Sequence, residues 1–270
     1  MPYPPNTPLG RFGVANIDAG PRRFVATMPV SGLVNPLTGA ATVAPLTLLV
    51  DHIGGLVNHT RRGADEWTLT SELTLEVVPG GLDLITAAPD TVVTATAHPV
   101  GSKARIALAR CDLMVGAGVV ATATVRSFYT ALPARLTTWR EPEIAGQTAL
   151  RGRSLADLLA VRIGETGSAA RVLLQDEDPA LDNNAGMVHG GASAMALELV
   201  ASAAVQTPDP DAQMATGSLR VNYLRPFHSG GGAHYLATPL RVGRASAVAD
   251  ATAVNADGTV ALRARLTAYR

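Results

Sequence analysis

The chain lacks the features that would place it in a membrane or in an oxidising compartment. Its one cysteine, Cys111, excludes an internal disulfide and fits a reducing environment. No run of about 18 apolar residues is available to span a bilayer, and the first residues lack the charged and apolar regions of a signal peptide. We therefore expect a soluble, cytoplasmic protein without a membrane partner.

Net charge and aromatic residues are also scarce. Lys and Arg number 22, as do Asp and Glu, so the formal net charge is zero. Because a nucleic-acid-binding protein needs a basic face, no nucleic-acid partner is expected. Aromatic residues make up 4% of the 270 residues and hydrophobic residues 47%, so Ala, Val and Leu must fill one large or two medium cores. No zinc-binding pattern is present, and no metal is expected.

One stretch combines a glycine-rich turn with a buried helix. Residues 183–191 read N-N-A-G-M-V-H-G-G, and residues 192–205 continue without Gly or Pro in a pattern typical of a helix. The glycines leave the first backbone N–H groups of the helix open to a ligand, and a helix N-terminus favours negative charge. Glu198 is the single charge inside this helix, which makes it a candidate acid or base. The alternative is an ordinary turn followed by a satisfied core acid.

These residues resemble the hotdog-fold thioesterases of the phenylacetate-pathway (PaaI-like) type. That family has an Asn, a Gly and then His-Gly-Gly at the head of a long helix with an acid inside it. Here the matching positions are Asn183, His189, Gly190 and Glu198. The family's next strand carries a Ser or Thr ten residues before a Pro, and Thr216 lies ten residues before Pro226 (226 − 10). The resemblance implies acyl-CoA hydrolysis.

The two halves of the chain repeat one unit. Asp51 lies in an apolar run 147 residues before Glu198 (198 − 51), and Pro79 lies 147 residues before Pro226 (226 − 79). The resemblance therefore covers nearly the whole chain as a tandem hotdog of the α+β class. It implies two antiparallel sheets, each wrapped around a long helix and paired like the chains of a dimer. The expected divisions are an N-terminal coil (1–20), a first hotdog domain (21–131), a linker (132–152) and a second hotdog domain (153–270).

Periodicity and turn residues predict the elements of both halves. Helices are expected over 43–58, 154–161 and 189–206. Strands are expected over 22–30, 67–78, 92–99, 102–114, 119–130, 171–176, 214–224, 232–242, 246–255 and 259–269.

Helix geometry pairs residues from different halves. Gly190 and Glu198 are eight residues apart, about 12 Å along one helix, whereas a base must lie within about 3 Å of the group it serves. The family's sites likewise combine residues from two partners. The expected site therefore joins Asn183, His189 and Gly190 to Asp51 and Thr70. The mirror-image site, with Glu198 and Thr216, is expected to be weak, because Thr42 stands nine residues before Asp51 where the second half has His189.

The residues assign roles for hydrolysis of an acyl thioester. Gly190 N–H would hold the oxyanion, and Asp51 would act as general base or as nucleophile. Thr70 would orient the water or the base, Asn183 would position the water or the thioester, and His189 is either catalytic or a brace for the turn. No cofactor is expected, because coenzyme A is part of the substrate. Arginines suited to its phosphates are Arg225, Arg241 and Arg244.

Two other functions are open at this point. A hotdog hydratase or dehydratase would need a His opposite an acid, and His189 with Asp51 fits that requirement. A non-catalytic acyl-CoA-binding module is the other, because one half has already lost its His-Gly-Gly. A further pairing into a dimer of double hotdogs is also possible.

Overall fold

A computed structural model describes residues 2–20, 22–30, 32–132, 153–164, 171–207, 209 and 213–270. All of the predicted linker except its first residue lies outside the described residues. Among the described residues, no helix is long and apolar enough to cross a membrane.

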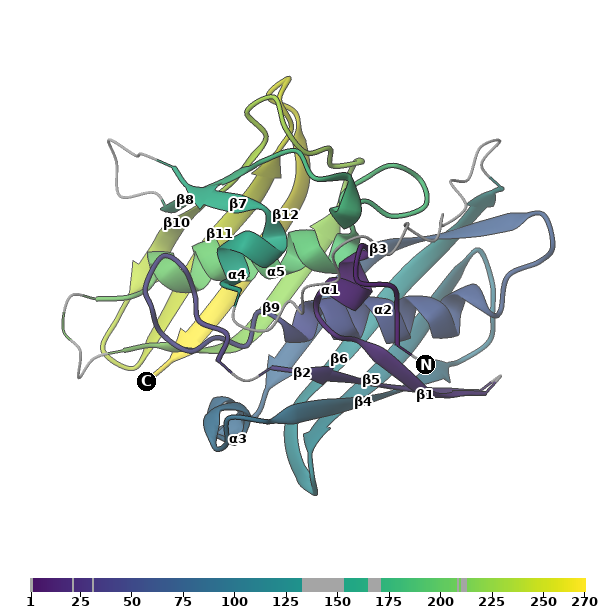
Figure 1. The fold of residues 1–270 in the computed structure, drawn as a ribbon, viewed down its shortest axis with the longest axis horizontal. Helices are drawn as coiled ribbons and strands as arrows, with labels where there is room; N and C mark the ends of the chain where they lie inside the picture. The colour runs from purple at the N-terminus through teal and green to yellow at the C-terminus, as the bar shows by residue number, and fades with distance from the viewer. Residues whose placement is uncertain are drawn as a thin grey trace.

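Twelve strands form one continuous sheet, in the order β1-β2-β4-β5-β6-β3-β9-β12-β11-β10-β8-β7, and every pairing in it is antiparallel. The first six strands in this order come from the first half of the chain and the other six from the second (Figure 1). The strands of the first half are β1 (Ala15–Gly20), β2 (Arg23–Pro29), β3 (Glu66–Val77), β4 (Val92–Val100), β5 (Ile106–Val115) and β6 (Gly118–Ala131). Those of the second half are β7 (Val161–Ile163), β8 (Arg171–Gln175), β9 (Ala215–Tyr223), β10 (His234–Val242), β11 (Ser246–Val254) and β12 (Val260–Tyr269).

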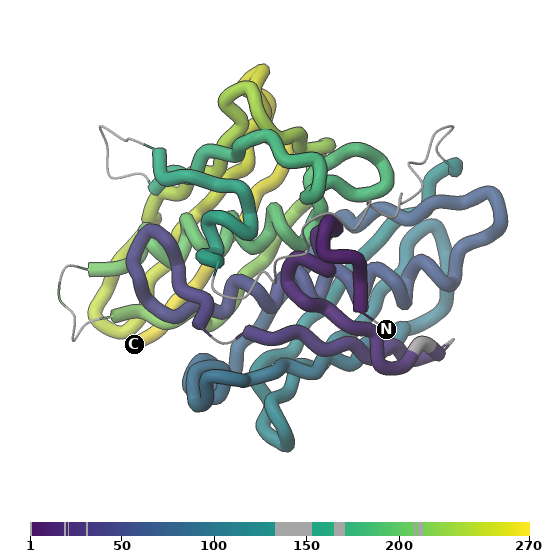
Figure 2. The backbone as a smooth tube through the Cα atoms, in the orientation of Figure 1, coloured from purple at the N-terminus to yellow at the C-terminus, as the bar shows by residue number. Residues whose placement is uncertain are grey.

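Each half curves around one long helix, α2 (Leu46–His59) in the first and α5 (Gly190–Ala204) in the second. Both helices lie on the same side of the sheet, one over each half (Figures 1 and 2). Both are buried along nearly their whole length, as their apolar sequences require. Gly54 faces the sheet, where a Cβ would lie 2.5 Å from the Val125 side chain, so its lack of a side chain lets α2 sit close to β6.

The halves meet at a pseudo-twofold axis between β3 and β9. Their pairing places Thr74 opposite Arg220, which are 146 residues apart (220 − 74). The same offset relates Thr70 of β3 to Thr216 of β9 (216 − 70). The strand pairing shifts register next to Thr70 in β3 and next to Thr216 in β9. The predicted pair of sheets, each around a helix, is therefore confirmed, and hydrogen bonds between β3 and β9 join the two into one sheet.

The N-terminal segment was wrongly predicted to be coil. It contains α1 (Pro8–Arg11), with Thr7 as N-cap, and β1, which pairs with β2 at the edge of the sheet. The sequence of β1 has little strand character, so its pairing with β2, and not its own propensity, makes it a strand. Arg11 then contacts the second half, where Nη1 lies 2.7 Å from Asp178 Oδ2. The segment therefore connects the two halves.

Most other differences from the predicted elements are at their boundaries. Helix α2 begins at Leu46, after Pro45, and β5 begins at Ile106, after the turn that contains Gly101. The predicted short helix is α4 (Leu155–Leu159), which Ser154 and Asp157 cap reciprocally. Besides α1 and β1, three short elements of the described residues were not predicted, namely β7, α3 (Gly81–Thr86) and the 3-10 turn η1 (Pro179–Leu181). They are too short to show a periodic pattern.

Candidate active site between the two halves

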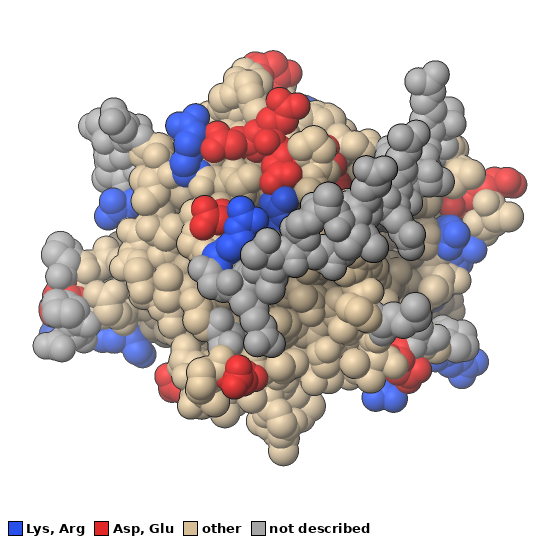
Figure 3. All heavy atoms as spheres, in the orientation of Figure 1, with Lys and Arg blue, Asp and Glu red and all other residues tan. Residues whose placement is uncertain are grey.

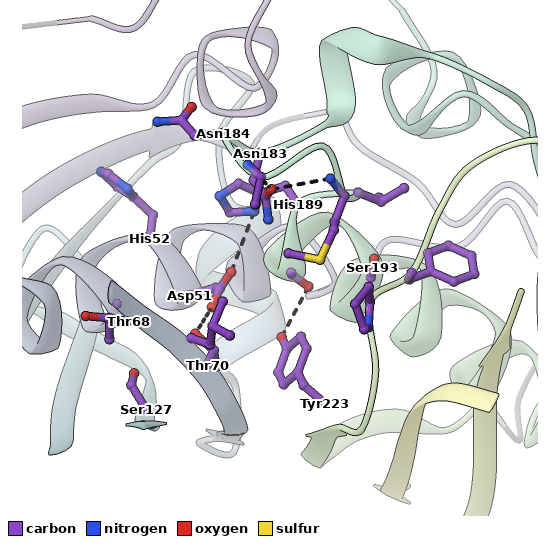
Figure 4. Close-up of a pocket in the computed structure, with 18 of the residues that line it drawn as sticks. Asp51, His52, Thr68, Thr70, Ser127, Asn183, Asn184, His189, Ser193 and Tyr223 are labelled. Carbon is purple, nitrogen blue, oxygen red and sulfur yellow. Dashed lines mark hydrogen bonds and ion pairs between the residues drawn. The ribbon is translucent and has the colours of Figure 1, made fainter. Parts of the chain in front are cut away.

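A cavity of about 460 Å³ lies where the two halves meet. Helix α2 and strand β3 border it from the first half, and helix α5, the end of β9 and the 183–188 loop border it from the second. Figure 4 shows side chains from both halves pointing toward this common space. Six of the predicted site residues border it, and they are Asp51, Thr70, Asn183, His189, Gly190 and Arg225.

Asp51 provides the carboxylate of the cavity. It lies on α2, and 8% of its surface is exposed. Thr70 of β3 donates its hydroxyl hydrogen to Asp51 Oδ1 at 3.0 Å (Figure 4). The second oxygen, Oδ2, has no hydrogen-bond donor among the described residues and lies 3.6 Å from His189 Nδ1. Thr70 therefore fixes one oxygen and leaves the other to the cavity.

His189 is the N-cap of α5. Its Nδ1 accepts a hydrogen bond from the backbone N–H of Gly191 at 3.1 Å. Because that N–H can only donate, Nδ1 must be unprotonated, and the proton of the neutral ring is on Nε2. Burial lowers the pKa of His189, although Asp51 partly opposes this effect. The contact between Nδ1 and Asp51 is thus not an ion pair at neutral pH.

Gly190 brings a backbone donor next to the carboxylate. A Cβ at this position would lie 2.9 Å from Asp51 Oδ2, so the residue and the carboxylate border the same small space. No described residue accepts a hydrogen bond from the Gly190 N–H. This donor at the first turn of a helix is therefore available for an oxygen that gains negative charge.

Asn183 is occupied partly by its own loop. Its Oδ1 accepts hydrogen bonds from the N–H groups of Ala185 at 2.9 Å and of Met187 at 3.4 Å (Figure 4). No described residue accepts a hydrogen bond from its Nδ2. The oxygen shapes the loop, and only the amide nitrogen remains to position a water or a substrate.

Tyr223 was missed by the sequence analysis. It ends β9, and its hydroxyl donates to the carbonyl of Gly190 at 3.1 Å (Figure 4). Its pKa is raised well above 10.0 by burial, and the charge of Asp51 adds to this effect. It lies between Thr216 and Pro226, but that spacing does not indicate its role, because the contact joins residues 33 positions apart through the fold of the second half. The residue at the matching position of the first half is Val77 (223 − 146).

The rest of the cavity extends along α2. Gly55 follows Asp51 by one helical turn, and a Cβ there would have no atom within 4 Å, so the cavity continues over it. Further along, His59 Nδ1 lies 3.1 Å from Thr68 Oγ1, and its ring meets Trp67 edge-on. His52 also borders the cavity, but Asn16 and Tyr3 hold its Nε2, and burial lowers its pKa to about 3. We regard His52 as structural.

The mirror-image site is a smaller cavity of about 170 Å³ around Glu198. Thr216 donates to Glu198 Oε1 at 2.6 Å and Thr42 donates to Oε2 at 3.0 Å. Thr42 matches His189 in position (189 − 42 = 147). Each side chain accepts a hydrogen bond from the backbone N–H two residues later, which belongs to Ala44 after Thr42 and to Gly191 after His189. Only 1% of Glu198 is exposed, against 8% of Asp51. Hydroxyl groups thus enclose the Glu198 carboxyl. Before α2, Val43 and Ala44 stand where α5 begins with two glycines.

Glu198→Gln is expected to change how stability depends on pH. Burial raises the pKa of Glu198 above its ordinary value of 4.5, although three hydroxyls partly oppose this effect. A raised folded-state pKa gives stability that is complete below the unfolded pKa and is lost as pH rises through the folded one. The free energy of unfolding of the wild type should therefore fall above about pH 4.5 relative to that of Glu198→Gln. Urea unfolding of both proteins across this range measures the difference, and parallel curves would contradict the raised pKa.

The predicted arginines are not gathered in one place. Arg225 borders the cavity, and its Nη1 donates to the carbonyl of Val260. Arg241 and Arg244 do not border it, because they lie at the β10–β11 turn. The strand pairings connect that turn to Tyr269 and Ala215, which is beside the smaller cavity. Among the described residues, no group of three or more His, Cys, Asp or Glu could hold a metal.

Comparison with known proteins places the fold. Residues 185–262 match the family described as the thioesterase superfamily. A putative thioesterase from Novosphingobium aromaticivorans has a similar structure, with a TM-score of 0.63 and 13% identity over 94% of this chain and 98% of that one. A hot dog fold protein of unknown function from Alicyclobacillus acidocaldarius has a TM-score of 0.56 and 14% identity over 94% of this chain and 95% of that one. The acyl-CoA thioesterase II TesB2 from Mycobacterium marinum has a TM-score of 0.57 and 10% identity over 94% of this chain and 95% of that one.

The matches to solved structures extend over nearly the whole chain, whereas the sequence match is confined to the half that carries His-Gly-Gly. No curated protein matches the sequence. The chain has a double hotdog fold, and residues 185–262 in its second half match the thioesterase superfamily.

Proposed function

We propose that this protein hydrolyses acyl-CoA thioesters in the cavity between its halves. The observation that carries the proposal is the meeting of Asp51 from one half with the free N–H of Gly190 from the other. The match of residues 185–262 to the thioesterase superfamily supports the reaction class. Thiol release from a panel of acyl-CoAs of different chain length, aryl groups included, tests the proposal.

The two halves would divide the chemistry between them. The thioester carbonyl oxygen accepts a hydrogen bond from Gly190 N–H, and that donor stabilises the oxyanion by about 3–4 kcal/mol. Oδ2 of Asp51 either removes a proton from an attacking water or attacks the carbonyl carbon itself, which would form an anhydride that water then opens. In both routes the bond to sulfur breaks and a thiolate leaves. It takes its proton from Asp51 in the first route and from water in the second. The Thr70 hydroxyl holds Asp51 in place through Oδ1.

The protonation state of His189 favours hydrolysis over hydration of an enoyl thioester. Hydration would use His189 as a base, but its Nδ1 lone pair already accepts the Gly191 N–H. In the neutral ring Nε2 then carries the proton, so neither nitrogen has a free lone pair. Crotonyl-CoA should therefore not be hydrated by this protein, and hydration would overturn the assignment of His189.

The surroundings of the cavity indicate where the phosphates of coenzyme A would lie. At the end of α2, Arg61 donates to the carbonyl of Gly101 at 2.8 Å, which brings the turn that carries Lys103 and Arg105 close to Arg61 and Arg62. Two acids, Asp65 and Glu66, follow Arg61 and Arg62 in the chain, and Glu66 pairs with Lys103.

The chain that leads to the 183–188 loop carries acidic residues, of which Asp176 pairs with Arg162 and Asp178 with Arg11. Acidic side chains gather over the β8–η1 region in Figure 3, where Asp176, Glu177, Asp178 and Asp182 occur. They precede the 183–188 loop that borders the cavity from the second half. The polyanionic end of the substrate is therefore assigned to the α2 side.

Reversing two of these charges should weaken binding of acyl-CoA. In the double variant Arg62→Glu and Arg105→Glu, we expect KM to rise about tenfold with little change in kcat, because exposed charges contribute modestly to binding. The same acyl group on pantetheine, which lacks the nucleotide, should show no such rise. Arg241→Glu is the matched control, since Arg241 lies in β10 of the other half and not beside the end of α2. An equal rise for both substrates, or for Arg241→Glu, would remove the phosphate assignment.

A further inference from the structure

Two side chains hold one peptide group at the start of α5 from opposite sides. This peptide joins Gly190 to Gly191. Its N–H donates to His189 Nδ1 at 3.1 Å, and its carbonyl accepts the hydroxyl of Tyr223 at 3.1 Å. Figure 4 shows His189 and Tyr223 approaching the start of the helix from different directions. The backbone of His189 is also held, because its N–H donates to the carbonyl of Leu181 at 2.8 Å.

The position needs such a constraint because its residues are both glycine. Glycine has more backbone freedom than any other residue, and the first turn of a helix lacks the hydrogen bonds that hold later turns. Neither residue can be replaced by a larger one without contact, since a Cβ at Gly191 would lie 2.7 Å from Leu48 Cα and one at Gly190 would lie 2.9 Å from Asp51 Oδ2. The Gly190 N–H belongs to the preceding peptide, His189–Gly190, whose carbonyl accepts the Ser193 N–H at 3.0 Å. Rotation about the Gly190 Cα is then limited by the partners of the Gly190–Gly191 peptide.

Both partners keep the protonation state that the contact requires. Tyr223 must donate and His189 Nδ1 must accept. Burial keeps the phenol protonated by raising its pKa, and burial keeps the imidazole neutral by lowering its pKa. The nearby charge of Asp51 raises the pKa of Tyr223 further and only partly opposes the lowering at His189.

The other half offers an internal comparison. There Thr42 accepts the N–H of Ala44, as His189 accepts that of Gly191. The residue that matches Tyr223 is Val77, which has no hydroxyl, and the glycines are replaced by Val43 and Ala44. The second contact is thus present only in the half that has a free glycine N–H beside a carboxylate.

We infer that Tyr223, together with His189, is a positioning residue that fixes the Gly190–Gly191 peptide and so keeps the adjoining Gly190 N–H directed at the thioester carbonyl. This inference rests on the proposed hydrolysis. Tyr223 acts through the backbone and does not touch the reacting atoms.

Tyr223→Phe tests the inference because it removes the hydroxyl and keeps the ring. We expect kcat to fall about tenfold, the effect of losing one hydrogen bond, with KM unchanged. Tyr129→Phe is the matched control, because the Tyr129 hydroxyl donates to the backbone carbonyl of Asn58 at 2.8 Å and Tyr129 does not border the cavity. It should leave kcat unchanged.

Amide hydrogen exchange provides a second readout that does not depend on activity. In Tyr223→Phe the Gly191 amide should exchange faster than in the wild type, and in Tyr129→Phe it should not. Unchanged exchange in Tyr223→Phe overturns the inference, even if kcat falls, because the hydroxyl would then act on the substrate itself. Unchanged kcat in an active enzyme also overturns it. If the wild type hydrolyses no thioester, the proposed function fails, and the exchange result alone decides whether Tyr223 holds the peptide.

Discussion

Asp51→Asn is expected to lower kcat for the best acyl-CoA substrate by about two orders of magnitude or more. The substitution keeps the size of the side chain and leaves an oxygen that can accept the Thr70 hydroxyl. It removes the negative charge and the basic oxygen beside Gly190, so neither general-base catalysis nor direct attack remains possible. Thiol release under saturating substrate measures the effect.

Glu198→Gln is the matched control for Asp51→Asn. Glu198 occupies the equivalent position on α5, but hydroxyl groups enclose it and it borders only the smaller cavity. Its replacement should leave kcat within about twofold of the wild type, because no proposed catalytic group contacts it. The opposite pattern, with activity lost in Glu198→Gln and kept in Asp51→Asn, would move the active site to the smaller cavity.

Gly191→Ala is expected to destabilise the protein by about 1–3 kcal/mol, the usual cost of overpacking. The added Cβ would lie 2.7 Å from Leu48 Cα and 3.1 Å from the carbonyl oxygen of Thr47. Both are backbone atoms of α2, so the clash cannot be relieved by rotation of a side chain. The helices must separate, and that movement also carries Gly190 away from Asp51. Urea unfolding measures the loss of stability.

Gly55→Ala separates this packing effect from the ordinary consequences of replacing glycine in a helix. A Cβ at Gly55 would have no atom within 4 Å. Alanine should therefore stabilise α2 by about 0.5–1 kcal/mol through its higher helix propensity. If Gly191→Ala were as stable as the wild type, the close approach of the two helices would not depend on glycine.

The sequence was sufficient to predict the pairing of residues across the two halves. The rise of an α-helix separates Gly190 from Glu198 whatever the fold, so the carboxylate beside Gly190 had to come from elsewhere. The repeat identified Asp51 as that residue, and the structure brings Asp51, Thr70, Asn183, His189 and Gly190 to one cavity. Whether they catalyse hydrolysis is a question for the Asp51 variant.

Other residues could not be predicted because their contacts join distant parts of the chain. Tyr223 lies between Thr216 and Pro226 in sequence, but neither residue indicates its contact, and only the end of β9 places its hydroxyl on the Gly190 carbonyl. Arg241 and Arg244 are candidates by chemical type alone, and the strand order places them at the β10–β11 turn, where they border neither cavity. Strand β1 likewise depends on a partner, β2, for its structure.

The sequence by itself determined the repeat, the two buried helices and the half that retains a free glycine N–H, because helix length, apolar pattern and glycine position are local properties. Only the tertiary structure decided which groups surround each carboxyl. Asp51 receives one hydroxyl and keeps one oxygen open to a large cavity, whereas Glu198 is enclosed by hydroxyls from both halves. The physical reason is that solvation and hydrogen bonding of a buried carboxyl depend on every element packed around it, and those elements are distant in sequence.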